Sequence, residues 1–438
     1  MTSDASAVSA EVFQNEYLPE GGTIVDAVVT VTVGEGGAAQ PSRASAAEII
    51  MIDCSGSMSG SKIRAARDAA CVAIDMLRDG VAFAVIGGTH QAWVAYPGSG
   101  LPGSGLATAS PQTREQAKQA VKRLDADGGT NFRTWLSLAN KLFSADHSDI
   151  KHAILLTDGA NGDRGADFRQ VLDSCTGKFV CDSRGVGHGW LARDLILVAD
   201  TLLGTAAGMK DPTALREDFQ AMMEAAMGKT MADVALRLWT PSGARVRFVK
   251  QVFPEINDLT GRRVDTGPRV GEYPLGAWGA ESRDYHLSIE VEANPVGEEM
   301  LAGRVSVVHR DQVLTQGLIR AVWTDDLAAS TKINGRVAAY SGQAELADAI
   351  KEGLDARAAG DADRATSRLG HAVRLAHETG RSDTAKLLAG VVDVVDAATG
   401  TVKLRKRSEA ADVDINAEMA AVGSRKTQRV RPNEPAEG

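Results

Sequence analysis

The feature that most constrains the fold is an alternation of short apolar segments with amphipathic segments, beginning near residue 46. Residues 48–53 (EIIMID) have the composition of a buried strand, and residues 61–77 carry apolar side chains at helical spacing. The same patterns predict strands at 81–86, 91–96 and 152–157 and helices at 114–124 and 132–143. Apolar strands separated by helices form a mostly parallel sheet covered on both faces. We therefore expect an α/β doubly wound domain over residues 46–210.

Strand-like segments lie on both sides of this domain. Residues 24–33 (IVDAVVTVTV) alternate as a strand does, and short strand-like runs separated by turn residues recur between 233 and 323. Because the N-terminal strands lack a sheet of their own, we expect residues 1–45 to join a β-sandwich. Residues 211–330 would supply a linking helix and the rest of that sandwich, so the α/β domain would be inserted within it.

The C-terminal part changes character twice. Residues 334–400 have a helical period and predict a small helical bundle. Residues 401–438 hold eight basic and six acidic residues with few apolar ones, and we expect a disordered tail. Within it, Thr427 lies between basic residues (RKTQR) and is a candidate phosphorylation site. Phosphate would add a charge of about −1.5 to −2 and create a ligand for an arginine-lined pocket; an unmodified solvated end is the alternative.

Composition bounds the classes of function. The 438 residues exceed a typical domain of about 100–200 residues and predict two to four units. The 48 basic and 57 acidic residues give a net charge of −9, which argues against general nucleic-acid binding. No apolar run approaches the about 18 residues that span a bilayer, and the first residues lack the pattern of a signal peptide. We therefore expect a cytoplasmic protein that does not bind membranes, and its four cysteines to be free thiols.

Oxygen-bearing side chains occur where the predicted strands end. Asp53, Ser55 and Ser57 form an Asp-x-Ser-x-Ser sequence after the first strand of the α/β domain. Thr130 follows a helix in a Gly-Gly-Thr sequence, and Asp158 ends another strand in Thr-Asp-Gly. Ligands of open parallel sheets bind at the carboxyl ends of the strands, so we expect these side chains to meet there. Two carboxylates and three hydroxyls suit Mg²⁺ or Mn²⁺ better than Zn²⁺. A helix cap and a turn are the structural alternative.

This set of residues resembles the metal-ion-dependent adhesion site of von Willebrand factor type A domains. The resemblance covers about residues 46–210, and all five motif positions are present. It implies a doubly wound α/β fold that binds a protein partner through the metal, often through an Asp or Glu of that partner, and that is seldom an enzyme. The rest of the chain resembles actinobacterial proteins encoded near Ser/Thr protein kinases, PPM-type phosphatases and forkhead-associated (FHA) proteins. This implies an adaptor in a Ser/Thr phosphorylation circuit, with such proteins as partners.

Other classes of function fit the sequence less well. A subunit of a machine driven by an AAA-type ATPase, similar to chelatases, is the main alternative. The loop at residues 56–60 (GSMSG) looks like a nucleophile elbow, but its central residue is Met58 rather than serine. Residues 228–230 (GKT) end like a phosphate loop, yet Met223 stands where the first glycine is required. A metal-dependent hydrolase is therefore the least favoured interpretation, and we expect no enzyme activity.

Overall fold

The computed structural model describes residues 8–34, 44–98, 105–162, 165–405 and 414–430, and the chain forms two compact units. The first, which we call the sandwich unit, comprises Met1–Gln40, Asp233–Leu404 and Ser424–Gly438. The second, the α/β unit, comprises Pro41–Ala232 and Arg405–Gly423. The chain thus leaves the sandwich unit twice and returns to it twice.

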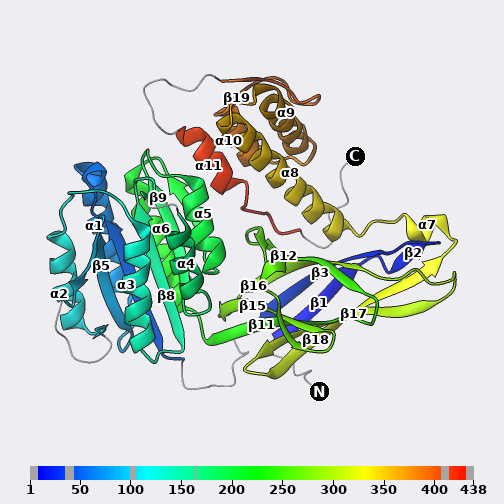
Figure 1. Ribbon diagram of the computed structural model, residues 1–438, viewed down its shortest axis with the longest axis horizontal. Coiled ribbons are helices and arrows are strands. Elements are labelled where there is room, and N and C mark those ends of the chain that lie inside the picture. The colour runs from blue at the N-terminus through cyan, green and yellow to red at the C-terminus, as the bar shows by residue number, and fades with distance from the viewer. Residues whose placement is uncertain (1–7, 35–43, 99–104, 163–164, 406–413, 431–438) are drawn as a thin grey trace. The chain divides into compact units, whose positions relative to one another are not determined.

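The α/β unit is built on a seven-stranded sheet with the order β10-β9-β8-β4-β5-β6, in which β7 also pairs with β5 (Figure 1). All strands run parallel except β6 and β7, which are antiparallel to β5. This confirms the predicted doubly wound fold. The strands are β4 (Ala46–Asp53), β5 (Ala82–Gly88), β6 (Ala92–Tyr96), β7 (Ala107–Thr108), β8 (Ile150–Thr157), β9 (Val180–Val186) and β10 (Ala206–Met209).

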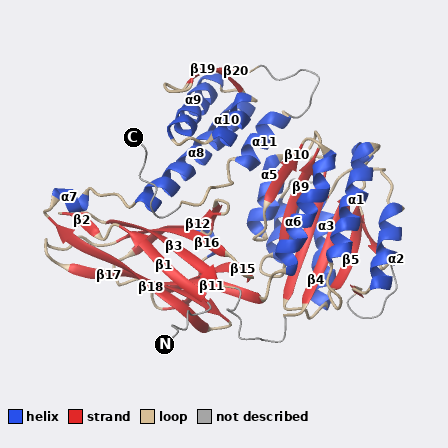
Figure 2. Cartoon of the chain, turned by 180° about the vertical axis from the view of Figure 1, so that it is seen from behind, coloured by secondary structure: helices blue, strands red, loops and turns tan. Residues whose placement is uncertain are grey.

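Helices cover both faces of this sheet (Figures 1 and 2). Alternate residues of β4 point to opposite faces, and Ile49 and Met51 share a fully buried core with Trp135 and Leu195. The helices are α1 (Ser61–Met76), α2 (Pro111–Lys122), α3 (Phe132–Ala145), α4 (Ala166–Cys175), α5 (Ala192–Thr201) and α6 (Leu215–Met227). We expected α6 to link the α/β domain to the sandwich, but it packs against α1 inside the α/β unit, with Phe219 fully buried.

The sandwich unit contains a five-stranded sheet, β1-β3-β16-β12-β13, and a six-stranded sheet, β14-β15-β11-β17-β18-β2. The N-terminal strands belong to both sheets, because β3 lies between β1 and β16 while β2 pairs with β18. The strands are β1 (Val8–Gln14), β2 (Tyr17–Pro19), β3 (Ile24–Val33), β11 (Met231–Trp239), β12 (Arg245–Phe253), β13 (Asn257–Asp258), β14 (Val264–Gly267), β15 (Val270–Trp278), β16 (Ser282–Glu290), β17 (Glu299–His309) and β18 (Gln312–Thr324). The sandwich is therefore assembled from segments on both sides of the α/β domain.

Helices follow the sandwich in the same unit: α7 (Leu327–Ser330), α8 (Gly335–Ala358), α9 (Ala362–Glu378) and α10 (Ser382–Ala389). Val337 and Tyr340 of α8 pack on Val28 and Val252 of the first sheet, which fixes this helix to the sandwich. The predicted bundle is wrong in its last part, because β19 (Val392–Asp396) and β20 (Thr401–Leu404) form a hairpin. In this hairpin β20 packs against α9 and β19 against α10, which buries Val392 and Val402, while Val394 and Val395 are exposed.

The expectation of a disordered tail from residue 401 is also wrong for the residues that the structure describes. After β20, the helix α11 (Ile415–Gly423) packs against β10 and α5 of the α/β unit. Met419 lies against the sheet core, and a carboxylate oxygen of Glu418 accepts the backbone N–H of Ala192 at 2.6 Å. The apolar side chains of this short helix thus find a partner that local sequence does not reveal.

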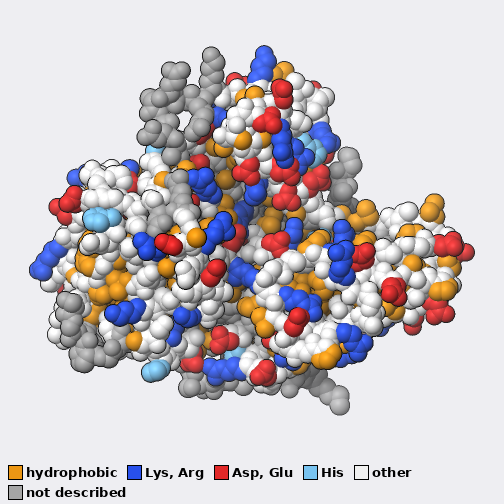
Figure 3. Space-filling view, in the orientation of Figure 1, with side chains coloured by type: hydrophobic (Ala, Val, Ile, Leu, Met, Phe, Trp, Pro, Cys, Tyr) orange, Lys and Arg blue, Asp and Glu red, His pale blue; other side chains and the backbone are white. Residues whose placement is uncertain are grey.

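The surface has mixed charge on the face shown in Figure 3, where basic and acidic side chains of the described residues are intermingled. Within the described parts of the chain, none of the helices combines the length and the apolar character needed to cross a bilayer.

Candidate metal centre

The Asp-x-Ser-x-Ser sequence forms a tight loop at the carboxyl end of β4. Asp53 is the last residue of that strand, and Gly56–Met58 form a short 3₁₀ helix before α1 begins. Backbone hydrogen bonds tie this loop to its neighbours: the N–H of Cys54 donates to the carbonyl oxygen of Gly88 at 2.7 Å, and that of Gly56 to Gly128 at 2.9 Å. The loop that carries Thr130 is therefore fixed beside the loop that carries the serines.

The five side chains predicted from the sequence meet at this edge of the sheet. The hydroxyl oxygens of Ser55 and Ser57 are 3.1 Å apart, and Ser57 donates to Oδ1 of Asp158 at 2.6 Å. The hydroxyl of Thr130 lies 3.5 Å from Oδ2 of Asp53. A Cβ at position 159 would lie only 3.1 Å from the Thr130 hydroxyl, so glycine there leaves the centre of the cluster open. We call these five residues the metal-site cluster.

The two carboxylates of the cluster are buried. Asp53 and Asp158 are both 0% exposed, whereas Ser57 and the backbone at residues 128–129 are exposed. Burial raises the pKa of Asp53 to about 6, against the opposing effect of hydrogen bonds from Ser55 and Thr157. Two buried acidic groups at the end of a sheet carry an energetic cost that a cation would offset.

Two further residues contact the cluster and were not predicted. The hydroxyl of Thr157 donates to Oδ2 of Asp53 at 2.6 Å, while the N–H of Ser55 donates to Oδ1 at 2.7 Å, so both oxygens of that carboxylate are oriented. Lys62, at the start of α1, forms an ion pair with Oδ2 of Asp158. Thr157 could have been identified from the Thr-Asp-Gly sequence, because it directly precedes the candidate ligand Asp158. Lys62 could not, because its partner Asp158 lies 96 positions away in the chain.

The residues present fit a small divalent cation. All five side chains of the metal-site cluster offer oxygen, the ligand atom that Mg²⁺ and Mn²⁺ prefer. Among the residues that the structure describes, no group of three or more His, Cys, Asp and Glu side chains could hold a metal ion, so a metal held here must use hydroxyl ligands as well. One lysine ammonium neutralises only one of the two buried carboxylates. The nearby Asp125 and Asp127 are exposed and belong to the loop surface.

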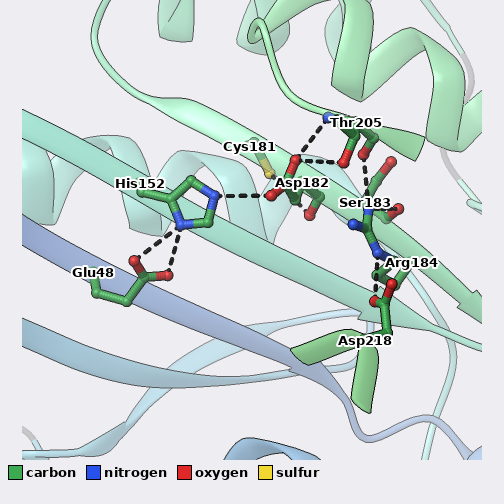
Figure 4. Close-up of polar contacts among 8 residues, drawn as sticks. All are labelled: Glu48, His152, Cys181, Asp182, Ser183, Arg184, Thr205 and Asp218. Carbon is green, nitrogen blue, oxygen red and sulfur yellow. Dashed lines mark hydrogen bonds and ion pairs between the residues drawn. The ribbon is translucent and has the colours of Figure 1, made fainter. Parts of the chain in front are cut away.

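A second polar cluster lies nearer the amino ends of the same strands (Figure 4). Both carboxylate oxygens of Glu48 lie 2.9 Å from Nδ1 of His152, and Nε2 of His152 lies 3.0 Å from Asp182. Arg184 lies two residues after Asp182 on β9, and its Nε donates to Oδ2 of Asp218 at 2.7 Å. We call Glu48, His152, Asp182 and Arg184 the buried ion network. Sequence analysis did not identify it.

The charges of the buried ion network stabilise one another. Burial disfavours a charged imidazole, but Glu48 and Asp182 outweigh it and raise the pKa of His152 to about 10. Burial also raises the pKa of Glu48, whereas hydrogen bonding to His152 holds the pKa of Asp182 below its ordinary value against the effect of burial. Thr205 completes the arrangement, since its N–H and hydroxyl both donate to Asp182, at 2.7 and 2.8 Å. This network has its hydrogen bonds satisfied internally and offers no open edge for a ligand.

Thr427 lies in a docked segment rather than in a free tail. Its hydroxyl donates to the carbonyl oxygen of Val252 at 2.6 Å, and its N–H donates to that of Pro254 at 3.0 Å. The side-chain amide of Gln343 on α8 exchanges hydrogen bonds with the backbone of Gln428, at 3.0 and 3.2 Å. We call residues 424–430 the C-terminal strap. The structure brings Thr427 to the sandwich, and it belongs to a different unit from the metal-site cluster.

Comparisons with known proteins agree with this architecture. A model of the von Willebrand factor type A domain matches residues 47–207, and a model of the von Willebrand factor type A C-terminal domain matches residues 374–415. A solved von Willebrand factor type A protein from Catenulispora acidiphila is 48% identical, with 98% of this chain and 99% of that chain covered and a TM-score of 0.89.

More distant proteins match the whole chain or part of it. The ArnB paralog VWA2 from Sulfolobus acidocaldarius is 14% identical, with 96% of this chain and 98% of that chain covered, and its TM-score of 0.57 shows a shared fold alone. An uncharacterized protein from Synechocystis is 29% identical over 219 residues, 48% of this chain, and this chain spans about half, 49%, of its length. On the full-length match and the two domain models, the chain belongs to the von Willebrand factor type A family.

Proposed function

We propose that this protein is an adaptor that binds a partner protein through a Mg²⁺ ion held by the metal-site cluster. Domains of this family commonly mediate metal-dependent protein interactions, and they are generally interaction modules rather than enzymes. The observation that carries the proposal is the convergence of Asp53, Ser55, Ser57, Thr130 and Asp158 on one edge of the sheet, with two buried carboxylates beneath an exposed rim.

The roles of the residues follow from their contacts. Asp53 and Asp158 supply negative charge, and the hydroxyls of Ser55, Ser57 and Thr130 supply neutral oxygens. Thr157 and the N–H of Ser55 orient the Asp53 carboxylate, as supporting groups commonly do for metal ligands. When bound, the ion supplies positive charge that an Asp or Glu of the partner would complement. Mn²⁺ suits the same oxygen set.

The chemistry of the site supports binding rather than catalysis. The five side chains include no imidazole or thiol, and we find no acid and base pair among them. The neighbouring Cys54 is buried, and burial raises the pKa of its thiol to about 12, so it is no nucleophile at neutral pH. A hydrolase and a subunit of an ATPase-driven machine therefore stay as alternatives without an observation that favours them. The cytoplasmic location is likewise a prediction.

A comparison of partner capture tests the proposal. The wild type and Asp53→Ala would be used to capture proteins from a lysate in Mg²⁺ and in EDTA, with Asp127→Ala as a control because Asp127 is an exposed carboxylate close to the site. We expect the wild type and the control to capture partner proteins in Mg²⁺ and to lose them in EDTA. Asp53→Ala should capture these partners in neither condition. Equal capture by all three variants in both conditions would contradict the proposal.

We also propose that Thr427 is a regulatory phosphorylation site, with a kinase, a PPM phosphatase and an FHA protein as the partners of that circuit. The docked hydroxyl donates to a carbonyl oxygen, so phosphate there would place negative charge against acceptors and release the strap. Thr427→Glu should increase trypsin cleavage after Arg425 and Lys426, whereas Thr427→Ser should not. Unchanged cleavage in Thr427→Glu, together with no phosphate on Thr427 after co-expression with such a kinase, would contradict this proposal.

A further inference from the structure

Lys62 occupies a specific position against the metal-site cluster. It is the second residue of α1, and its ammonium pairs with Oδ2 of Asp158 and donates to the carbonyl oxygen of Ser57 at 3.2 Å. The Asp158 side chain is 0% exposed, while that of Lys62 is 24% exposed. The positive charge therefore lies inside the site, but the lysine side chain retains a path to solvent.

A third element shapes this position. Gly187, just after β9, has φ +68°, and a Cβ there would lie 2.9 Å from Cε of Lys62. A larger residue at 187 would thus displace the aliphatic part of Lys62 as well as strain the backbone. The start of α1, the residue after β8 and the residue after β9 together fix the ammonium beside Asp158, which distinguishes it from a mobile surface lysine.

The charges indicate what this arrangement does. Asp53 and Asp158 are both buried, and isolated charges in such positions are costly. The Lys62 ammonium supplies one positive charge at the carboxylate that a divalent ion would also use. The Lys62 ammonium and a divalent ion would both be attracted to the carboxylate oxygens of Asp158, so each weakens the interaction of the other with that carboxylate.

We infer that Lys62 is an internal competitor of the metal, a residue that neutralises Asp158 in the metal-free protein and leaves that carboxylate when the metal binds. The inference rests on the proposed metal site and goes further, because it assigns the control of metal affinity to a residue outside the ligand set. Lys62 holds the metal-free loops in place and sets the concentration of metal at which the site fills.

Two measurements test this inference in the full chain. The first is Mg²⁺ titration by calorimetry of the wild type, Lys62→Met and the control Arg64→Met, which removes one exposed positive charge from the same helix. We expect Lys62→Met to bind Mg²⁺ about tenfold more tightly than the wild type, since loss of one charge-assisted contact changes an equilibrium by about that factor. The Arg64→Met variant should stay within about twofold of the wild type, because an exposed charge is largely screened.

The second measurement is chemical labelling of lysine amines, read by mass spectrometry with and without Mg²⁺. Lys62 should become several-fold more reactive in Mg²⁺, whereas Lys118, which is ion-paired with Asp75 away from the site, should not change. If the wild type binds Mg²⁺ but Lys62→Met has unchanged affinity and Lys62 labelling is unaffected, the inference is overturned and the metal site stands. If neither the wild type nor Lys62→Met binds Mg²⁺, the proposed function and this inference both fail.

Discussion

The metal-site cluster and the buried ion network lie on the same strands yet differ in how their charges are balanced. In the network, His152 lies between Glu48 and Asp182 with both ring nitrogens in contact, and Arg184 pairs with Asp218. In the cluster, two buried carboxylates face one ammonium, and Ser57 at the rim is exposed. Both sets are polar and mostly buried, so burial alone does not mark a binding site.

This difference in charge balance indicates which of the two clusters can bind a ligand. A network whose donors and acceptors are satisfied internally stabilises the fold, and removing one member leaves an uncompensated charge. A cluster with surplus negative charge and open oxygens gains by binding a cation. We therefore expect substitutions in the network to change stability without changing metal binding, and substitutions in the cluster to do the reverse.

The largest effect is expected from His152→Ala. This change leaves Glu48 and Asp182 facing each other without the cation between them, which should lower the free energy of unfolding by about 3–5 kcal/mol. All four cysteines lie in the α/β unit, and Cys54, Cys175 and Cys181 are buried, so their reactivity in increasing urea reports the unfolding of that unit.

The exposed His147 provides the control, and His147→Ala should change the free energy of unfolding by less than about 0.5 kcal/mol. Mg²⁺ affinity of His152→Ala, measured where the protein is folded, should equal that of the wild type. A large loss of Mg²⁺ affinity with little loss of stability would show that the two clusters are not separate in function.

Asp53→Asn should have the opposite profile. It removes one of two buried like charges and keeps the shape of the side chain, so stability without metal should change by no more than about 1 kcal/mol. Mg²⁺ affinity should fall at least about 100-fold, and the increase of the melting temperature with Mg²⁺ should disappear. A Mg²⁺-dependent shift that persists in Asp53→Asn would exclude this carboxylate as a ligand.

The pH dependence of stability separates the two clusters in another way. His152 has a folded pKa raised from its ordinary value of 6.5 to about 10, so its contribution is complete below about pH 6.5 and is lost as the pH rises through 10. The raised pKa of Glu48 acts in the same direction. The free energy of unfolding of the α/β unit should therefore fall by about 2 kcal/mol between pH 7 and 9.

The measurement is urea unfolding followed by cysteine reactivity at each pH, with His152→Gln as the reference. Comparing the two proteins at the same pH removes the ordinary pH dependence of thiol reactivity. The wild type should lose stability relative to His152→Gln as the pH rises. Parallel curves would show that His152 is neutral in the folded protein.

Sequence reasoning succeeded where the pattern is local. The strand that ends at Asp53 and the helix after it follow from apolar spacing, and the five oxygen-bearing residues follow from the rule that parallel strands share one carboxyl edge. The α11 helix could not be predicted in this way, because Met419 is partly buried through its contact with a sheet far away in the chain. Its short, polar surroundings suggested disorder instead.

Contacts between residues far apart in the chain also explain which residues of the two clusters sequence analysis missed. Glu48 and His152 are 104 positions apart, and neither has a local signal of partnership. A glutamate in an apolar strand could have raised the question of its counter-charge, since a buried carboxylate requires one. Lys62 looked like an ordinary residue of an amphipathic helix. Its role becomes visible only when Asp158 and Gly187 are placed beside it.

The smallest effect is expected from Thr157→Val, which keeps the shape of a fully buried side chain and removes the hydroxyl that donates to Oδ2 of Asp53. Groups that orient metal ligands typically change metal affinity about 10–100-fold, and we expect the lower end because the N–H of Ser55 still holds the other oxygen. Thr134→Val is the matched control, since the Thr134 hydroxyl donates to the carbonyl oxygen of Asn131, outside the cluster. Calorimetry should show about tenfold weaker Mg²⁺ binding for Thr157→Val alone. Equal affinity in both variants would mean that the Asp53 carboxylate is positioned by the backbone without help from Thr157.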